Sequence, residues 1–286
     1  MVPVNWVSTA LPTIKFIKKV RQTSKRAGKT LFCRLLKKLI QIAVMMTDTA
    51  WLSRTELLIG KEKLARLNAA HVLVVGMGGV GSFAAEFISR AGVGEMTIVD
   101  GDVVDPSNRN RQLPALATTH GQSKADIMGE RLLTINPELK LHVVKEFIMP
   151  ERVNNLFAEN LNFIVDAIDS ITPKLTLIKA AYARGVRLVS SMGAGGRLDP
   201  TLLKVTDISK TFNCPFAQQI RKELKMAGIY KGVTAVFSTE RPLKESMMFT
   251  DGTNFKKSAY GTISYLPATF GAVVASVVIR ELIVGH

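Results

Sequence analysis

Three short segments in the first half of the chain contain residue types that together could bind a nucleotide and act on its phosphates. The first is a glycine turn, in which Gly76, Gly78, Gly79 and Gly81 follow the apolar run at 72–75. Backbone N–H groups of such a turn can approach a phosphate, and the dipole of a following helix favours its negative charge. The turn predicts a nucleotide site, but alone it is compatible with NAD, FAD or ATP.

The second segment is a strand-like run that ends in Asp100, 19 residues after Gly81, with Asp102 close behind it. In nucleotide-binding α/β units, a carboxylate at the end of the second strand accepts hydrogen bonds from ribose hydroxyls. We therefore expect Asp100 and Asp102 to belong to the nucleotide site.

The third segment distinguishes between the possible nucleotides. Asn108, Arg111 and Gln112 follow the Asp100 strand, and Lys124 begins the next expected helix. Cations that converge on a phosphate chain neutralise the charge that develops as pyrophosphate leaves. A dinucleotide dehydrogenase has no use for them just past its ribose-binding carboxylate. The segment thus favours an attack on the α-phosphate of ATP.

A further carboxylate, Asp169, lies three residues after Asp166, which ends another strand-like run. Ligands bind at the carboxyl edge of a parallel sheet, and a carboxylate there can hold Mg²⁺ against phosphates. Taken singly, Arg111 fits a surface ion pair and Asp169 a helix N-cap. Together, at these spacings, they predict a site for ATP and Mg²⁺.

Hydrophobic periodicity predicts the elements that position these residues. Continuous apolar runs predict strands at residues 71–75, 95–100, 140–144, 162–166 and 186–190. The intervening stretches at 79–91, 123–135, 150–159 and 173–184 predict helices, and 52–67 predicts a helical arm ahead of them. This alternation predicts an α/β fold, a Rossmann-like, mainly parallel sheet with helices on both faces.

The pattern changes beyond Gly193. Residues 202–208 and 233–237 predict strands around a basic helix at 216–226, so a mixed C-terminal half extends the fold. The uncharged run at 263–279 is at the short limit for a membrane span. Its small residues favour a buried helix, and contact of the tail with a membrane is the less favoured alternative.

The formal net charge of +15 is concentrated at one end of the chain. Residues 1–46 contain ten Lys or Arg and no acid, whereas the other 240 residues hold 28 basic and 23 acidic side chains. We interpret 1–46 as a basic leader, either upstream of the true start or amphipathic, and 47–286 as one domain. Two cysteines, Cys33 and Cys214, exclude a disulfide framework and a four-thiolate zinc site, and favour the cytoplasm.

Residues 52–191 resemble the ubiquitin-activating-enzyme superfamily, the adenylating fold shared by the ThiF and MoeB proteins. The glycine turn, the Asp100 strand, the 107–112 segment, Lys124 and the 166–170 segment carry the resemblance. It implies that Asp100 binds the ribose of ATP and Asp169 binds Mg²⁺. It also implies that a set of polar side chains lines the triphosphate, namely Asn108, Arg111, Gln112 and Lys124. Arg54 corresponds to an arginine that this family supplies across a homodimer interface.

The second half is similar to the tRNA threonylcarbamoyladenosine dehydratases. The segments that carry this similarity are residues 192–201, 205–211, 220–225 and 236–242. The similarity implies ATP-dependent cyclisation of threonylcarbamoyladenosine next to the anticodon, through adenylation of its threonyl carboxylate. It also implies that residues 193–258 contact tRNA; the basic side chains there include Arg221, Lys222, Lys225, Lys204, Lys210 and Lys231. A solvated helix face is an equally good interpretation of that basic helix.

Three other functions stay open from the sequence. The first is an adenylating activator of a ubiquitin-like or sulfur-carrier protein, with Cys214 as acyl acceptor. Asn213 and Pro215 give that cysteine no activating base, and the chain lacks the paired Cys-x-x-Cys motifs of the family's structural zinc, so no zinc is expected. The second is a non-catalytic, nucleotide-dependent scaffold. The third, an NAD enzyme, is disfavoured by Arg111 and Lys124.

Overall fold

The computed structural model describes residues 49–249 and 258–284. The chain divides into two compact units, residues 1–53 and 54–286. The predicted leader at 1–46 lies outside the described residues, and the first unit contributes only the short 3₁₀ turn η1 (Thr49–Leu52) and the start of α3 (Ser53–Ile59). The rest of the description concerns the second unit.

A seven-stranded sheet forms the centre of this unit, in the order β3-β2-β1-β4-β5-β7-β6. Every neighbouring pair is parallel except β6 and β7, which are antiparallel. The strands are β1 (His71–Val75), β2 (Glu95–Val99), β3 (Lys140–Val144), β4 (Leu161–Asp166), β5 (Arg187–Ser191), β6 (Leu203–Asp207) and β7 (Thr234–Ser238). The predicted mainly parallel sheet with a mixed C-terminal half is confirmed.

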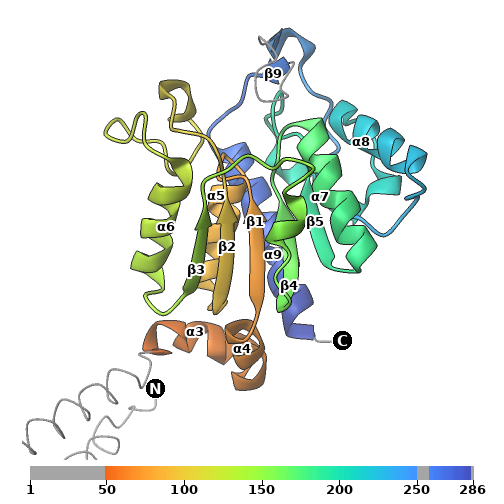
Figure 1. Cartoon of the computed structure of the whole chain (residues 1–286). Helices are drawn as coiled ribbons and strands as arrows, with labels where there is room; N and C mark the ends of the chain where they lie inside the picture. The colour runs from red at the N-terminus through yellow and green to blue at the C-terminus, as the bar shows by residue number, and fades with distance from the viewer. Residues whose placement is uncertain (1–48, 250–257, 285–286) are drawn as a thin grey trace, which may run out of the picture. The chain divides into compact units, whose positions relative to one another are not determined.

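Helices cover both faces of the sheet (Figure 1). One face packs against α5 (Gly81–Arg90), α6 (Lys124–Ile135) and α9 (Tyr265–Val284) through a cluster that includes Val74, Ile88 and Phe270. The other face packs against α7 (Ile171–Arg184), beside which lies α8 (Pro215–Met226). All five residues of β1 are buried, as expected for a central strand covered on both sides.

The apolar tail forms α9, which lies along α5. A Cβ at Gly271 would lie 2.6 Å from the carbonyl oxygen of Val80, so the glycine permits this close approach. By length and composition α9 could cross a membrane, yet nine of its residues, Leu266 and Val278 among them, are buried inside the protein. The predicted packing of the tail as a core helix is confirmed.

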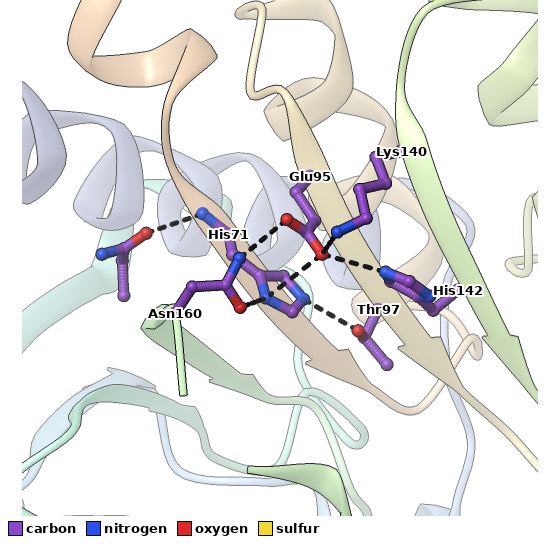
Figure 2. A network of polar contacts seen from close by, with 7 residues as sticks. His71, Glu95, Thr97, Lys140, His142 and Asn160 are labelled. Carbon is purple, nitrogen blue, oxygen red and sulfur yellow. Dashed lines mark hydrogen bonds and ion pairs between the residues drawn. The ribbon is translucent and has the colours of Figure 1, made fainter. Parts of the chain in front are cut away.

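A polar network joins the ends of the sheet strands that lie away from the carboxyl edge (Figure 2). The buried His71 ring bonds Thr97 Oγ1 at 2.9 Å and Asn160 Oδ1 at 3.0 Å. Glu95 pairs with Lys140 and with the His142 ring, both at 2.9 Å. Burial alone would raise the pKa of Glu95, but hydrogen bonds from Lys140, His142 and Asn160 outweigh it and hold the pKa at about 2.

Two predictions of local structure were wrong, and one pair of strands was missed. Residues 150–159 form only the 3₁₀ turn η3 (Val153–Leu156), because consecutive asparagines favour turns and only Val153 of the turn is buried. The expected arm at 52–67 is broken at Gly60, whose φ of 86° separates α3 from α4 (Lys61–Asn68). The two-stranded sheet of β8 (Met247–Phe249) and β9 (Ser258–Tyr260) was not predicted.

Candidate active site

The predicted glycine turn joins β1 to α5 at the carboxyl edge of the sheet. Gly76 has a φ of 93° and donates its N–H to the Val99 carbonyl at 2.8 Å. A Cβ at Gly76 would lie 2.8 Å from the Ala167 oxygen, and one at Gly81 only 1.7 Å from the Gly76 oxygen. These two glycines are therefore required by close backbone packing around the turn.

Gly78 and Gly79 differ in what they face. A Cβ at Gly79 would lie 2.9 Å from Pro267 at the start of α9. A Cβ at Gly78 would meet nothing closer than the Gln112 side chain, at 3.8 Å. No backbone atom blocks the approach to Gly78, which lies just before the positive end of α5, so this is the position of the turn at which a phosphate is expected.

Asp100 is held in one orientation beside the turn. Its Oδ2 accepts the N–H of Met77 at 2.5 Å, and its Oδ1 accepts the N–H of Asp102 at 2.7 Å. Burial raises the pKa of Asp100, and the N–H of Asp102, the Lys124 ammonium and the N–H of Met77 offset it only in part. The carboxylate oxygens keep further lone pairs that can accept hydrogen bonds from ribose hydroxyls.

Lys124 lies at the start of α6 and is almost completely buried. Its Nζ is 3.0 Å from Asp102 Oδ2, and its backbone N–H donates to the backbone carbonyl of Asp102 at 3.1 Å. Asp102 thus orients the ammonium of Lys124, which is close enough to Asp100 to lower that residue's pKa. The structure brings Asp100, Asp102 and Lys124 together, as predicted.

The 107–112 segment is shaped by a capping box. Asp105 accepts the N–H of Ser107 at 2.8 Å, and Asn108 Oδ1 accepts the N–H of Asp105 at 3.2 Å, around the turn η2 (Pro106–Asn108). Asn108 is buried, and its carbonyl accepts the N–H groups of Arg111 and Gln112. Asn108 therefore shapes the loop. The side-chain oxygen of Gln112 is buried with no hydrogen-bond partner in the structure.

Arg111 and Asp169 are close enough to interact electrostatically. Burial lowers the pKa of Arg111, while Asp169 and then Asp105 act against this shift. The guanidinium also donates to the Ser107 carbonyl and to Asn110 Oδ1, both at 2.9 Å. Asp169 follows β4 at the carboxyl edge, as predicted. Within residues 49–249 and 258–284 no three His, Cys, Asp or Glu side chains cluster as metal ligands.

Arg54 is exposed on α3, and the structure does not bring it to the glycine turn of its own chain. α3 and α4 precede β1 and lie at the end of the sheet where the strands begin (Figure 1). The neighbouring Leu57 and Leu58 are each 85% exposed.

A cavity close to the predicted site was not expected from the sequence. A cavity of about 530 Å³ follows β3 and is lined by Glu146, Phe147, Met149, Glu151 and Arg152. Phe147 lies against the residue next to Asp100, since a Cβ on Gly101 would be 2.7 Å from its ring. The signal was weak: residues 145–152 contain three consecutive apolar side chains, Phe147, Ile148 and Met149, that no helical pattern explains.

Two of the segments that carry the similarity in the second half, residues 192–201 and 236–242, are joined to each other by hydrogen bonds. The buried Arg197 donates to the Gly193 carbonyl and, at 2.9 Å, to the Glu240 carbonyl. Asp199 caps the turn η4 (Pro200–Leu202), and Asn110 Nδ2 donates to the Thr262 carbonyl at 2.8 Å. The hydrogen bond of Asn110 joins the segment that follows β9 to the 107–112 segment.

The basic helix predicted to contact tRNA is α8. Lys222 and Lys225 are exposed, but Arg221 donates to Thr211 Oγ1 at 2.5 Å and is partly buried. Arg221 therefore anchors α8 to the preceding loop. Cys214 is buried in an apolar cluster at the start of α8.

Comparison with known proteins gives the same identification along most of the chain. The ThiF family matches residues 52–286. A tRNA threonylcarbamoyladenosine dehydratase of Bacillus subtilis is 41% identical over 238 residues, which are 81% of this chain and 94% of that protein. Two crystal structures of the Escherichia coli tRNA N6-threonylcarbamoyladenosine dehydratase TcdA also match. The ATP complex has a TM-score of 0.74 at 36% identity, covering 82% of this chain and 95% of the other. The AMP complex has a TM-score of 0.75 at 38% identity, covering 84% and 97%.

Proposed function

The chain belongs to the ThiF family and, within it, to the tRNA threonylcarbamoyladenosine dehydratases, and from this premise we propose that it cyclises threonylcarbamoyladenosine in tRNA at the expense of ATP. The observations that carry the proposal are the electrostatic interaction of Arg111 with Asp169, which follows β4 at the carboxyl edge, and a glycine turn in which only the Gln112 side chain lies near Gly78. Those residue types at that place suit the transfer of an adenylyl group.

ATP lies with its phosphates over Gly78 and its ribose on Asp100. Arg111 and Lys124 neutralise the charge of the phosphate chain, and this stabilisation matters most as pyrophosphate departs. The side-chain amide nitrogen of Gln112 is the atom nearest to Gly78, at 3.8 Å from its Cβ position, while the side-chain oxygen has no partner in the structure and is available to a donor of a bound group or a water molecule. The cavity beside Phe147 takes the adenine, because it opens next to the residue that follows Asp100.

Asp169 is the residue of this chain that would hold Mg²⁺ bound with the nucleotide. A single carboxylate fits this role, because Mg²⁺ bound with a nucleotide completes its shell with phosphate oxygens and water. Bound there, the ion would supply electrostatic stabilisation of the phosphates. Arg111, on the same side of the turn, keeps the carboxylate of Asp169 from facing the phosphates as an uncompensated negative charge.

The reaction divides into two steps in which this chain provides position and charge. An oxygen of the threonyl carboxylate attacks the α-phosphate of ATP, so that an acyl-adenylate forms and pyrophosphate leaves. The ureido group of the same nucleoside then attacks the activated carbonyl, AMP leaves and the attacking group loses its proton. The net change is the loss of one water from the nucleoside. The closing nucleophile belongs to the substrate, so no protein acyl acceptor is needed.

The tRNA approaches the carboxyl edge, where the loops of residues 193–249 lie. Lys222 and Lys225 are exposed on α8 and suit contacts to phosphates, which are the main source of RNA affinity. Arg221, engaged with Thr211, contributes chiefly through the position of α8.

A second copy of the chain completes the assembly. Leu57 and Leu58, each 85% exposed on a short helix with no buried residue, suit burial against another protein surface. Arg54 on the same helix would then act on the partner's nucleotide. Sedimentation of wild type and of Leu58→Ser would test the dimer, since loss of the apolar contact should shift the equilibrium toward monomer.

The rival activity, activation of a ubiquitin-like or sulfur-carrier protein, lacks support from Cys214. That thiol is 4% exposed within an apolar cluster, and although Cys214 is the N-cap residue of α8, its side chain makes no capping hydrogen bond. Cys214→Ala separates the two functions: a dehydratase keeps its activity, whereas an enzyme that transfers an acyl group through the thiol loses it.

A further inference from the structure

Asp166 and Lys174 form an ion pair that is completely shielded from solvent. The two side chains are 0% exposed, and Lys174 Nζ is 2.8 Å from Asp166 Oδ2. Burial lowers the pKa of Lys174, against the opposing effect of the Asp166 carboxylate. Removing two charges from water costs several kcal/mol per ion, and apolar residues of similar volume often serve stability as well. Stability alone is therefore a weak reason for a buried pair at this place.

The pair holds one peptide segment from both sides. Asp166 Oδ1 accepts the N–H of Ile168 at 3.1 Å, while Lys174 Nζ donates to the carbonyl of the same Ile168 at 2.9 Å. Ser190 Oγ donates to Asp166 Oδ2 at 2.6 Å and completes the carboxylate's hydrogen bonds. Both backbone polar groups of Ile168 are thus fixed by the ion pair.

Ile168 lies between the glycine turn and Asp169. On its N-terminal side, Ala167 donates its N–H to Val75 at 2.9 Å, and its carbonyl packs against Gly76. On its C-terminal side the next residue is Asp169, which interacts with Arg111. The segment 167–169 is therefore held by β1 at one end and by the ion pair at its centre.

We propose that Asp166 and Lys174 are positioning residues that set the place of the Asp169 carboxylate relative to the glycine turn. The proposal rests on the function proposed above, in which Asp169 faces the ATP phosphates. Neither member of the pair touches substrate, since both side chains are completely buried. Their effect passes through the backbone of Ile168, and Lys174 also interacts electrostatically with Asp169.

The test compares a double variant, Asp166→Leu with Lys174→Met, with wild type. It replaces both charges by apolar side chains of similar size, which spares the fold but removes both hydrogen bonds to Ile168. We expect faster amide hydrogen exchange in residues 167–170 and a fall in kcat of about 10- to 100-fold, because a misplacement of about 1 Å can cost this much. The Kd for ATP measured without Mg²⁺ should change less than about threefold, since the contacts of Gly78 and Asp100 remain.

Two further variants make the outcome specific. Glu86→Leu with Arg131→Met removes the ion pair between α5 and α6, which does not contact Ile168, and should leave both readouts as in wild type. Asp166→Asn keeps an oxygen for the N–H of Ile168 and leaves Lys174 bonded to its carbonyl, so it should keep more of the wild-type kcat than the double variant, although the loss of the charged partner of Lys174 should lower the free energy of unfolding.

Unchanged exchange in residues 167–170, or unchanged kcat, in the double variant would overturn the proposal. If that variant does not fold, Ser190→Ala removes one support of Asp166 and should give faster exchange with a two- to fivefold lower kcat; no change in either would overturn it too. The exchange readout needs no substrate. A wild-type protein that fails to act on tRNA would therefore contradict the proposed function without affecting that measurement.

Discussion

Gly78→Ala is expected to separate ATP binding from folding. The only atoms within 4 Å of a Cβ at this position belong to the Gln112 side chain, at 3.8 and 3.9 Å, and Gly78 does not have a positive φ. The folded protein should therefore accept the methyl group, and the smaller entropy of the unfolded chain should stabilise it by up to about 1 kcal/mol. The methyl group nevertheless occupies the open space assigned to phosphate.

The loss of one backbone contact to a charged phosphate is worth about 1.5–3 kcal/mol, which corresponds to an increase of roughly 10- to 150-fold in the Kd for ATP. Isothermal titration with ATP, paired with thermal unfolding without it, measures both quantities. Gly81→Ala provides the contrast, because its Cβ would lie 1.7 Å from the Gly76 oxygen and should lower stability as well as affinity. A Gly78→Ala protein that binds ATP like wild type would refute the placement of the phosphates over this residue.

Three further predictions follow from other parts of the structure. Arg111→Ala should lower kcat by about 10²- to 10³-fold in a tRNA dehydration assay, whereas the exposed neighbour Arg109→Ala should keep nearly full activity; equal losses would contradict the role of Arg111. The pKa of Glu95 is lowered to about 2, so the stability it contributes is present above pH 4.5 and is lost as the pH falls from 4.5 toward 2. Glu95→Gln should therefore be less stable than wild type at pH 6, by on the order of 2 kcal/mol, and the difference should shrink in denaturant titrations at pH 3. Gly271→Ala should lower the free energy of unfolding by about 1–3 kcal/mol, because its Cβ would lie 2.6 Å from the Val80 oxygen; an unchanged Tm would show that α9 does not pack tightly on α5.

The central strands β1, β2 and β4 could be predicted from sequence because most of their residues are buried, whereas the edge strand β3 is mostly exposed and was found by its short apolar run. The runs that form β1 and β3 were predicted with the bounds that the structure has, and those of β2, β4 and β5 within one residue at each end. Continuous apolar segments of this kind have few other interpretations. The 150–159 region failed because its apolar residues contact the core from a turn, where no periodic pattern arises.

The candidate site was predictable as a set of residues but not as a set of roles. Four glycines were assigned to the nucleotide, yet only at Gly78 would a Cβ avoid a close contact, while Gly76 and Gly81 are required by backbone packing and Gly79 lies against Pro267. Asp102 was expected to bind nucleotide, and the structure pairs it with Lys124. Such distinctions depend on which atoms meet in three dimensions, and local sequence does not contain them.

The ion pair that fixes Ile168 shows the same limit. Asp166 and Lys174 are eight residues apart, on β4 and on α7; the sequence predicted Asp166 at the end of a strand and a helix at 173–184, and no role was assigned to Lys174. Their contact arises only when α7 packs on the sheet and both side chains are completely buried. A lysine on an otherwise apolar helix face was the one signal available beforehand.

The proposed function is tested most directly with purified protein, ATP, Mg²⁺ and tRNA that carries threonylcarbamoyladenosine, with no carrier protein added. Mass spectrometry of the digested nucleosides should show that threonylcarbamoyladenosine loses the mass of one water molecule, with one AMP formed per nucleoside converted, and that Asp169→Asn prevents both changes. An unchanged nucleoside, with AMP formed only when a small carrier protein is supplied, would contradict the account.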